Sequence, residues 1–151
     1  MKKLSGEILL FLTPLVILIS GLEITVRSMP NQYKYKKSYV QRNGNDIEIL
    51  VLGQSQTQSG LIPENFDLNC FSFAIDAQSL RYDLAIFNKF SGDLTNLSYI
   101  ILPMNFYTFY FETAKSSQTK AWARNYPLYL GIKTDEVPFY ERFEFTSPVF
   151  K

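Results

Sequence analysis

The apolar residues of the chain gather in one long run at the N-terminus and in three shorter runs in its middle. The long run covers residues 8–22, contains no charged residue and follows a basic N-terminal start. This layout is typical of a signal peptide or a signal anchor. Extended past Glu23 to residue 26, the run approaches the roughly 20 residues that span a bilayer. We therefore predict an uncleaved transmembrane anchor over residues 1–27, with a cleaved signal and a buried core helix as the alternatives.

The three shorter runs have the length and composition of β-strands. They are rich in Ile, Val, Leu and aromatic residues, each is followed by a polar turn, and they cover residues 47–53, 70–75 and 97–104. Between the second and the third run, Leu80, Leu84 and Phe87 recur at helical spacing within residues 77–90. Ile86 and Phe90 widen this apolar stripe. The pattern predicts a strand–helix–strand unit whose helix is capped by Asp76.

Two crossover connections between near-continuous apolar strands indicate a parallel sheet covered by helices on both faces. Pro63 lies in the first crossover, so any helix there is expected to be short. The predicted fold is α/β: a three-layer, parallel-sheet half-domain over residues 47–151, joined to the anchor by a polar, tyrosine-rich stalk over residues 28–46. Because a three-stranded sheet is small and leaves an edge exposed, we expect these residues to be the front part of a larger domain.

The last third of the chain has a less regular pattern. Residues 106–113 are mostly aromatic, and a helix is expected near residues 118–125. The aromatic side chains of 106–113 and Trp122 are expected to pack in a core rather than to face lipid or a sugar ring.

Composition excludes several kinds of site. The net charge is +1 and no cluster of Lys and Arg resembles a nucleic-acid footprint, so nucleic acid is not an expected partner. The single cysteine, Cys70, excludes an internal disulfide and a CxxC site, and neither a metal nor another cofactor is expected. The sequence contains no histidine, which removes the usual general base near neutral pH. Any interpretation of the chain as a hydrolase has to account for that missing imidazole.

Polar residues follow each predicted strand at its carboxyl end. Ser55 follows the first strand, residues 76–78 follow the second, and Asn105 follows the third. Functional residues of parallel sheets gather at this edge, so we expect these residues to lie close together. Ser55 then has the position of a nucleophile, while Asn105 and the backbone N–H groups around Ala77 can stabilise an oxyanion. A plain polar turn is the alternative for Ser55, because the full GxSxG pattern is absent.

Three blocks of the sequence resemble the SGNH (GDSL-like) hydrolase superfamily, in particular its membrane-anchored members of bacterial cell envelopes. The blocks read VLGQSQT, FSFAIDAQSL and ILPMNF, and their order and spacing match the family over roughly residues 5–132. The resemblance implies a three-layer, flavodoxin-like fold. It implies that Ser55 is the nucleophile and an oxyanion donor, that Ala77 is a backbone donor where the family usually has glycine, and that Asn105 is a side-chain donor.

By the same resemblance, the function is that of a membrane-anchored acyl-ester hydrolase or O-acyltransferase acting on cell-surface carbohydrate. Its expected partners are the lipid bilayer and an acylated polysaccharide. The resemblance also implies a single-pass membrane protein whose domain lies outside the cytoplasm. The positive-inside rule favours the opposite orientation, because the basic residues after the apolar run outnumber Lys2 and Lys3; they are Arg27, Lys34, Lys36, Lys37 and Arg42.

The sequence departs from the family at several positions. The family's final Asp-x-x-His block has no counterpart, Gln56 stands where a histidine often follows the nucleophile, and Pro103 and Phe106 replace the Gly and Asp of the third block. Loss of a triad base costs many orders of magnitude in rate, so the chain as given is expected to be inactive. It is either an N-terminal fragment or a degenerate member, and the alternative function is a non-enzymatic, membrane-anchored binding or assembly protein of the envelope.

Overall fold

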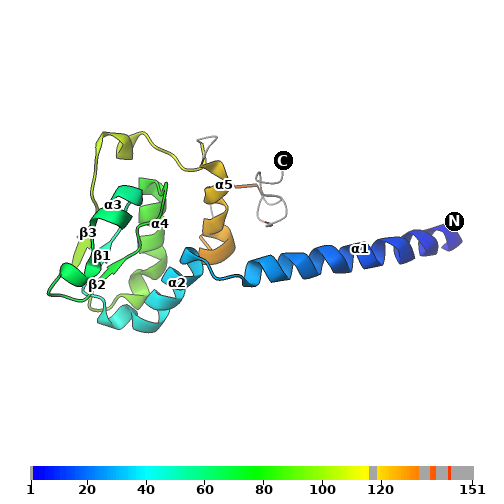
Figure 1. The fold of residues 1–151 in the computed structure, drawn as a ribbon, viewed down its shortest axis with the longest axis horizontal. Coiled ribbons are helices and arrows are strands. Elements are labelled where there is room, and N and C mark those ends of the chain that lie inside the picture. The colour runs from blue at the N-terminus through cyan, green and yellow to red at the C-terminus, as the bar shows by residue number, and fades with distance from the viewer. Residues whose placement is uncertain (1, 116–118, 133–136, 139–142, 144–151) are drawn as a thin grey trace.

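The computed structural model describes residues 2–115, 119–132, 137–138 and 143, and it has an α/β fold preceded by a long apolar helix (Figure 1). The helices and strands are α1 (Lys2–Ser28), α2 (Gln32–Asn43), β1 (Ile49–Val51), α3 (Ser55–Gly60), β2 (Cys70–Ser72), α4 (Leu80–Phe90), β3 (Tyr99–Ile101) and α5 (Lys120–Ala123).

Helix α1 is long and apolar enough to cross a membrane. The segment that meets this condition is Leu9–Ser28, 20 residues long, and none of it is buried inside the protein. Figure 1 shows α1 projecting away from the rest of the chain, with the N-terminus at its far end. A helix that is apolar and unburied needs a non-aqueous environment for its side chains. The predicted apolar helix is confirmed; its orientation in a membrane stays a prediction.

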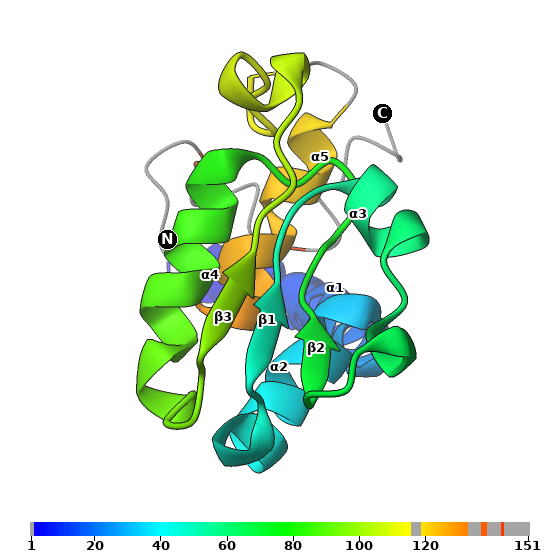
Figure 2. The same ribbon diagram turned by 90° about the vertical axis from the view of Figure 1, so that its left-hand side faces the viewer.

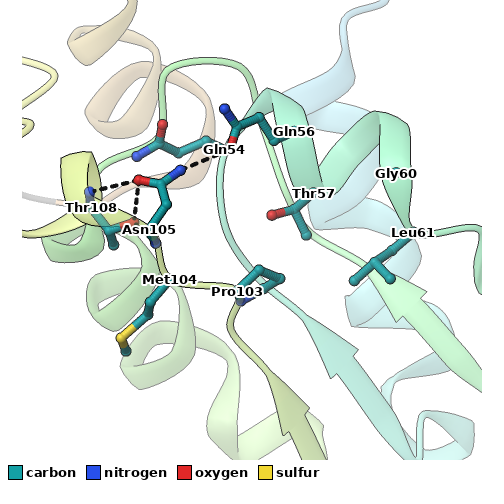
Figure 3. A pocket seen from close by; sticks show the side chains of 9 residues that line it. All are labelled: Gln54, Gln56, Thr57, Gly60, Leu61, Pro103, Met104, Asn105 and Thr108. Carbon is teal, nitrogen blue, oxygen red and sulfur yellow. Dashed lines mark hydrogen bonds between the residues drawn. The ribbon is translucent and has the colours of Figure 1, made fainter.

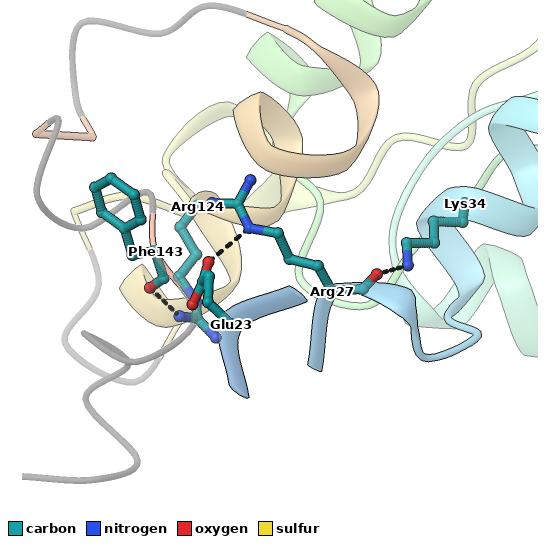
Figure 4. A network of polar contacts seen from close by, with 5 residues as sticks. All are labelled: Glu23, Arg27, Lys34, Arg124 and Phe143. Carbon is teal, nitrogen blue, oxygen red and sulfur yellow. Dashed lines mark hydrogen bonds and ion pairs between the residues drawn. The ribbon is translucent and has the colours of Figure 1, made fainter. Parts of the chain in front are cut away.

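Polar contacts join the end of α1 to the domain (Figure 4). Arg27 pairs with Glu23 one turn earlier, at 2.5 Å between Nε and Oε1, and its guanidinium lies 5.7 Å from the centre of the Phe143 ring. The ammonium group of Lys34 in α2 donates to the backbone carbonyl of Arg27. Arg124, just after α5, donates to the carbonyl of Phe143 at 3.1 Å. Among these contacts, the one between Arg27 and Phe143 connects α1 with a segment that is distant in sequence.

The segment predicted to be a stalk, residues 28–46, is instead folded onto the domain. It contains α2, whose N-cap Asn31 accepts a hydrogen bond from the backbone N–H of Lys34 at 3.0 Å. Tyr33 and Val40 belong to the hydrophobic core, although the helix is polar on average. The prediction of a stalk failed because the few core contacts of this helix do not stand out among its polar residues.

Lys36 of α2 covers one edge of the sheet. Its ammonium group donates to the carbonyls of Ser72 and Ala74, at 2.9 and 2.6 Å, and the side chain is buried. Burial lowers the pKa of Lys36 to about 8, and the charge of Asp76 opposes this shift, so the group remains a charged donor at neutral pH. A lysine at this place also blocks the addition of another strand beside β2.

The three strands form a parallel sheet in the order β2-β1-β3, as the apolar runs predicted. Leu50 at the centre pairs with Phe71 on one side and with Ile100 on the other. All three residues of β1 are buried, which fits a central parallel strand. β3 lies at the other edge, where Tyr99 and Ile100 remain exposed.

The described residues form two layers rather than the three that were predicted. Figures 1 and 2 show α2, α4 and α5 on one side of the sheet, while α3 stands beyond the carboxyl ends of the strands. The core side chains from the sheet include Leu50 and Phe71, which join residues of α2 and α4 in one cluster. The first crossover contributes only α3 and a short 3₁₀ turn at Pro63–Asn65, so it adds no helix long enough to form a third layer.

Helix α4 forms where it was predicted, but it starts later and buries only part of the predicted apolar stripe. Its buried side chains include Tyr82, Ile86 and Phe90, whereas Leu84 of the predicted stripe is 60 % exposed. The N-cap residue is Ser79 and not Asp76. The intervening turn at Ala77 has a positive φ, which a right-handed helix cannot contain.

Candidate functional site

The turn after β1 presents Ser55 at the carboxyl edge of the sheet. Gly53 has φ +125°, and a Cβ at this position would lie 2.6 Å from the hydroxyl oxygen of Thr57, so only glycine fits. Ser55 is the first residue of α3 and is exposed. The sequence thus folds as the predicted strand–turn–helix, with the serine at the surface.

The turn after β2 lies next to the Ser55 turn. The pairing of β2 with β1 continues beyond the strands, because the N–H of Ile75 donates to the carbonyl of Gly53 at 3.1 Å. Ala77 follows with φ +52°, a left-handed conformation that favours glycine. The hydroxyl group of Thr113 donates to the carbonyl of Ala77 at 2.7 Å and accepts from the N–H of Ser79 at 3.0 Å. Thr113 therefore holds this turn in its strained conformation.

Asn105 follows β3 and reaches the same edge. Its Nδ2 donates to Oε1 of Gln56 at 2.8 Å, and Gln56 is the residue after Ser55. Its Oδ1 accepts from the N–H of Thr108 at 3.1 Å, while the N–H of Asn105 donates to the Thr108 hydroxyl at 3.0 Å. This reciprocal capping box orients the carboxamide of Asn105.

A cavity of about 320 Å³ lies between the turn after β1 and the segment after β3 (Figure 3). Its polar lining is uncharged, consisting of carboxamides and hydroxyl groups; the lining residues are Gln54, Gln56, Thr57, Gly60, Leu61, Pro103, Met104, Asn105 and Thr108. Of the three predicted site residues, only Asn105 lines this cavity. Ser55 lies in the sequence between two lining residues, Gln54 and Gln56, but neither Ser55 nor Ala77 belongs to the lining. The carboxamide N–H groups of this cavity can donate hydrogen bonds to carbonyl or hydroxyl oxygens of a ligand.

A buried polar network lies beneath the Ser55 turn. The N–H of Gly53 and the Nε2 of Gln78 both donate to Oδ1 of Asp83, at 2.8 and 2.6 Å. The hydroxyl group of Tyr126 donates to Oε1 of Gln78 at 3.2 Å. Asp83, Gln78 and Tyr126 are each at most 2 % exposed. The network therefore connects the end of β1 and the Ala77 turn to α4 and to the π-helical turn Tyr126–Leu130.

Burial is the largest cause of the shifted pKa values in this network. Removal from water raises the pKa of Asp83 to about 6, although the hydrogen bonds from Gln78 and Gly53 oppose the shift. Burial also raises the pKa of Tyr126 well above its ordinary value, and the nearby Tyr33, Asp83 and Tyr82 act in the same direction. The Asp83 carboxyl thus changes its charge in mildly acidic solution.

Asp83 and Tyr126 were not predicted from the sequence, whereas Gln78 was expected at the carboxyl edge of the sheet but without a buried partner. One signal was present, because Asp83 lies three residues after Leu80 and four before Phe87, within a stripe read as apolar. A carboxylate within an apolar helix stripe predicts either that this face of the helix is exposed or that the carboxylate has a buried hydrogen-bond partner. The contact of Asp83 with Gly53 could not be read from the sequence, since Gly53 lies 30 residues earlier in the chain.

The aromatic residues after Asn105 are exposed, which corrects the prediction that they pack in a core. Phe106, Tyr107, Phe109 and Tyr110 are each at least 68 % exposed and lie on or beside the 3₁₀ turn Phe106–Phe109. Phe106 contacts Tyr107 edge-on and lies 5.2 Å from Tyr110 between ring centres. This short turn cannot direct four large side chains inward, so an aromatic surface borders the cavity.

Among the described residues, no group of three or more His, Cys, Asp or Glu side chains is arranged to hold a metal ion. Comparison of the chain with models of protein families, with characterised proteins and with solved structures found no match.

Proposed function

We propose that this chain carries the nucleophile and oxyanion half of an SGNH-type acyl-ester hydrolase or O-acyltransferase, anchored in a membrane by α1 and acting on cell-surface carbohydrate. The observation that carries the proposal is the contact between Asn105 and Gln56. It joins the segment after β3 to the turn that bears Ser55, and both belong to the blocks that resemble the family. The left-handed Ala77, at a position where the family usually has glycine, adds support from the second block.

In the proposed reaction, Oγ of Ser55 attacks the carbonyl carbon of an acyl ester and its proton passes to a base. The carbonyl oxygen becomes an oxyanion, which Nδ2 of Asn105 and backbone N–H groups at the turns stabilise. Collapse of this intermediate expels the alcohol, which takes up the proton, and leaves the acyl group on Ser55. Water or a second alcohol then accepts the acyl group. Because Asn105 donates to Gln56, substrate has to displace that hydrogen bond.

The base is the missing component, since the sequence has no histidine. The Asp83 carboxyl group belongs to the network beneath the Ser55 turn, where it accepts hydrogen bonds from Gly53 and Gln78. It positions the turn and is not the base in this proposal. Activity as the chain stands is therefore expected to be very low, with only binding and oxyanion stabilisation remaining.

Carbohydrate suits the surface around the cavity. Carboxamides such as those of Gln54, Gln56 and Asn105 can both donate to and accept from sugar hydroxyl groups. The exposed rings of Phe106 and Tyr110 offer flat apolar surfaces beside these amides. An uncharged, amide-rich cavity next to aromatic rings supports a neutral sugar as the alcohol part of the ester.

Chemical rescue by imidazole tests the proposal. Added imidazole supplies the missing base, so turnover of an activated acyl ester should rise with imidazole concentration beyond the rise in protein-free solution. Ser55→Ala should remove the excess, whereas Ser59→Ala, on the same helix and also exposed, should retain it. Equal rates in wild type and Ser55→Ala would remove Ser55 from the mechanism.

A second candidate function is a non-enzymatic, membrane-anchored envelope protein that binds carbohydrate. The lack of histidine, together with the uncharged cavity, favours it. It predicts saturable binding of a neutral oligosaccharide, lowered by Phe106→Ala, with no Ser55-dependent ester turnover at any imidazole concentration. The rescue experiment therefore separates the two functions.

A further inference from the structure

A second, apolar groove adjoins the candidate site. It has a volume of about 630 Å³ and lies between α4, β3 and the segment after Asn105. Leu84 and Phe87 of α4 line one wall, Ile100 and Leu102 line another, and Phe111 contributes to a third. Leu84 is 60 % exposed and Ile100 is 45 % exposed. Sites for small organic ligands are of this size, mostly apolar with a few polar groups.

The groove and the carboxamide-lined cavity share one wall. Thr108 lines both of them, and it is the same residue whose N–H and hydroxyl group bond to Asn105. A carbonyl group held at Asn105 therefore has an apolar channel next to it on the other side of Thr108. This adjacency identifies the occupant, since a linear hydrocarbon attached to that carbonyl would enter the groove.

We infer that the groove binds the acyl chain of the substrate, and that this chain is a hydrocarbon of several carbons rather than an acetyl group. The inference rests on the proposed function, because it identifies the acyl part of the same ester. An acetyl group would leave the groove empty and its leucine, isoleucine and phenylalanine side chains in water. Each methylene group buried in such a groove strengthens binding by about fourfold.

Three charged residues line the groove: Arg81, Asp83 and Glu112. Asp83 contacts Gly53 and Gln78, so its carboxyl group is already hydrogen-bonded. Glu112 has a buried carboxylate oxygen, Oε2, without a hydrogen-bond partner. With one basic and two acidic residues, the lining does not discriminate between a neutral and an anionic head group. The contact of Thr108 with Asn105 places the polar end of the ligand, with the ester carbonyl near Thr108.

Binding of neutral, unreactive analogues tests the inference without any need for catalysis. The full chain, in lipid nanodiscs, is titrated with straight-chain methyl ketones from butanone to decanone, with empty discs as the background. Affinity should rise by about fourfold per methylene group. A decanone that carries a diazirine at its chain end should crosslink to α4 or β3. No dependence on chain length, or crosslinks confined to other segments, would overturn the inference.

Matched tryptophan variants locate the effect. Leu84→Trp should fill the groove and weaken decanone binding by about tenfold, equivalent to roughly two buried methylene groups, while leaving butanone unchanged. Ile62→Trp is the control, because Ile62 is 54 % exposed and lies outside the lining of the groove. Equal effects of the two substitutions would contradict the inference.

The outcomes separate this inference from the proposed function. Rescue by imidazole without a chain-length effect would overturn the acyl groove and leave the function standing. A chain-length effect without Ser55-dependent turnover would overturn the function and, with it, the assignment of the groove to a substrate's acyl chain.

Discussion

Asp83 couples the turn that bears Ser55 to the interior of the domain. Its carboxyl group holds the N–H of Gly53, whose carbonyl pairs with Ile75 next to the Ala77 turn. A buried acceptor that serves two donors fixes both of them, and its loss leaves the donors unpaired. The geometry of the Ser55 turn therefore depends on a residue that cannot be recognised from the turn itself.

The raised pKa of Asp83 makes stability depend on pH. Between its ordinary value of 3.8 and about 6, the folded protein binds more protons at Asp83 than the unfolded chain does. The free energy of unfolding should therefore fall as the pH rises through this window, by up to about 3 kcal/mol from this group. Denaturant unfolding at pH values across the window measures the change.

Asp83→Asn is the matched variant for that measurement. The amide keeps an oxygen acceptor for Gly53 but does not ionise, so this part of the fall with pH should be absent. The other carboxylates titrate in both proteins and cancel in the difference. Parallel pH profiles for wild type and Asp83→Asn would contradict the assignment of the shift to Asp83.

Replacement of Ala77 with glycine should stabilise the folded protein. Its φ of +52° costs an L-residue about 1–2 kcal/mol, which glycine avoids. After the greater flexibility of glycine in the unfolded chain is subtracted, Ala77→Gly should raise the free energy of unfolding by about 0.5–1 kcal/mol. Thermal or denaturant unfolding measures it. Ala85→Gly, in helix α4, is the control and should lose about 1 kcal/mol; a similar loss in Ala77→Gly would refute the strain.

At the scale of elements, local pattern predicted the strands, the short α3 and the position of α4. Each of these depends on the apolar spacing of its own residues or, for α3, on Pro63. Helix α2 could not be predicted in the same way. Its packing depends on Tyr33, Val40 and the ammonium group of Lys36, which bonds to carbonyls near β2. A lysine that pairs with distant backbone has the same appearance in sequence as a solvated lysine.

Val40 tests whether α2 is part of the fold. Its side chain is fully buried in the core, while the adjacent Gln41 is exposed. Val40→Asp should destabilise the domain by about 3 kcal/mol or more, because it buries an unpaired charge, and Gln41→Asp should change stability by less than about 0.5 kcal/mol. Chemical denaturation compares them. Equal stabilities would restore the interpretation of residues 28–46 as a stalk.

At the scale of the whole molecule, sequence predicted a parallel α/β sheet behind an apolar helix but not the number of layers. A second helical layer requires a crossover long enough to place a helix on the other face. Residues 54–69 form only α3 and a 3₁₀ turn, so the helices of the described part lie on one side. The candidate site was predicted in part: its strand ends were correct, while the buried network and exposed aromatic rings depend on contacts between distant segments.

Helix α1 should retain the protein in membranes. The full chain is expected to resist alkaline carbonate extraction and to be released by detergent. Val16→Lys together with Leu12→Lys should lower the membrane-bound fraction, because each charge at mid-membrane costs about 2.5–3.5 kcal/mol. Tyr35→Lys, an exposed position outside α1, is the control and should leave the fraction unchanged. Release of the wild type by carbonate would refute a membrane anchor.

The central claim is that Ser55 accepts an acyl group beside Asn105, and mass spectrometry of the trapped intermediate tests it most directly. The full chain is incubated with an activated acyl ester and imidazole, quenched in acid, and mapped by peptide mass. We expect one acyl group on the peptide of Ser55, less of it in Asn105→Ala, and none at Ser59. Acylation spread over several serines and lysines, or the same yield in Ser55→Ala, would contradict the account.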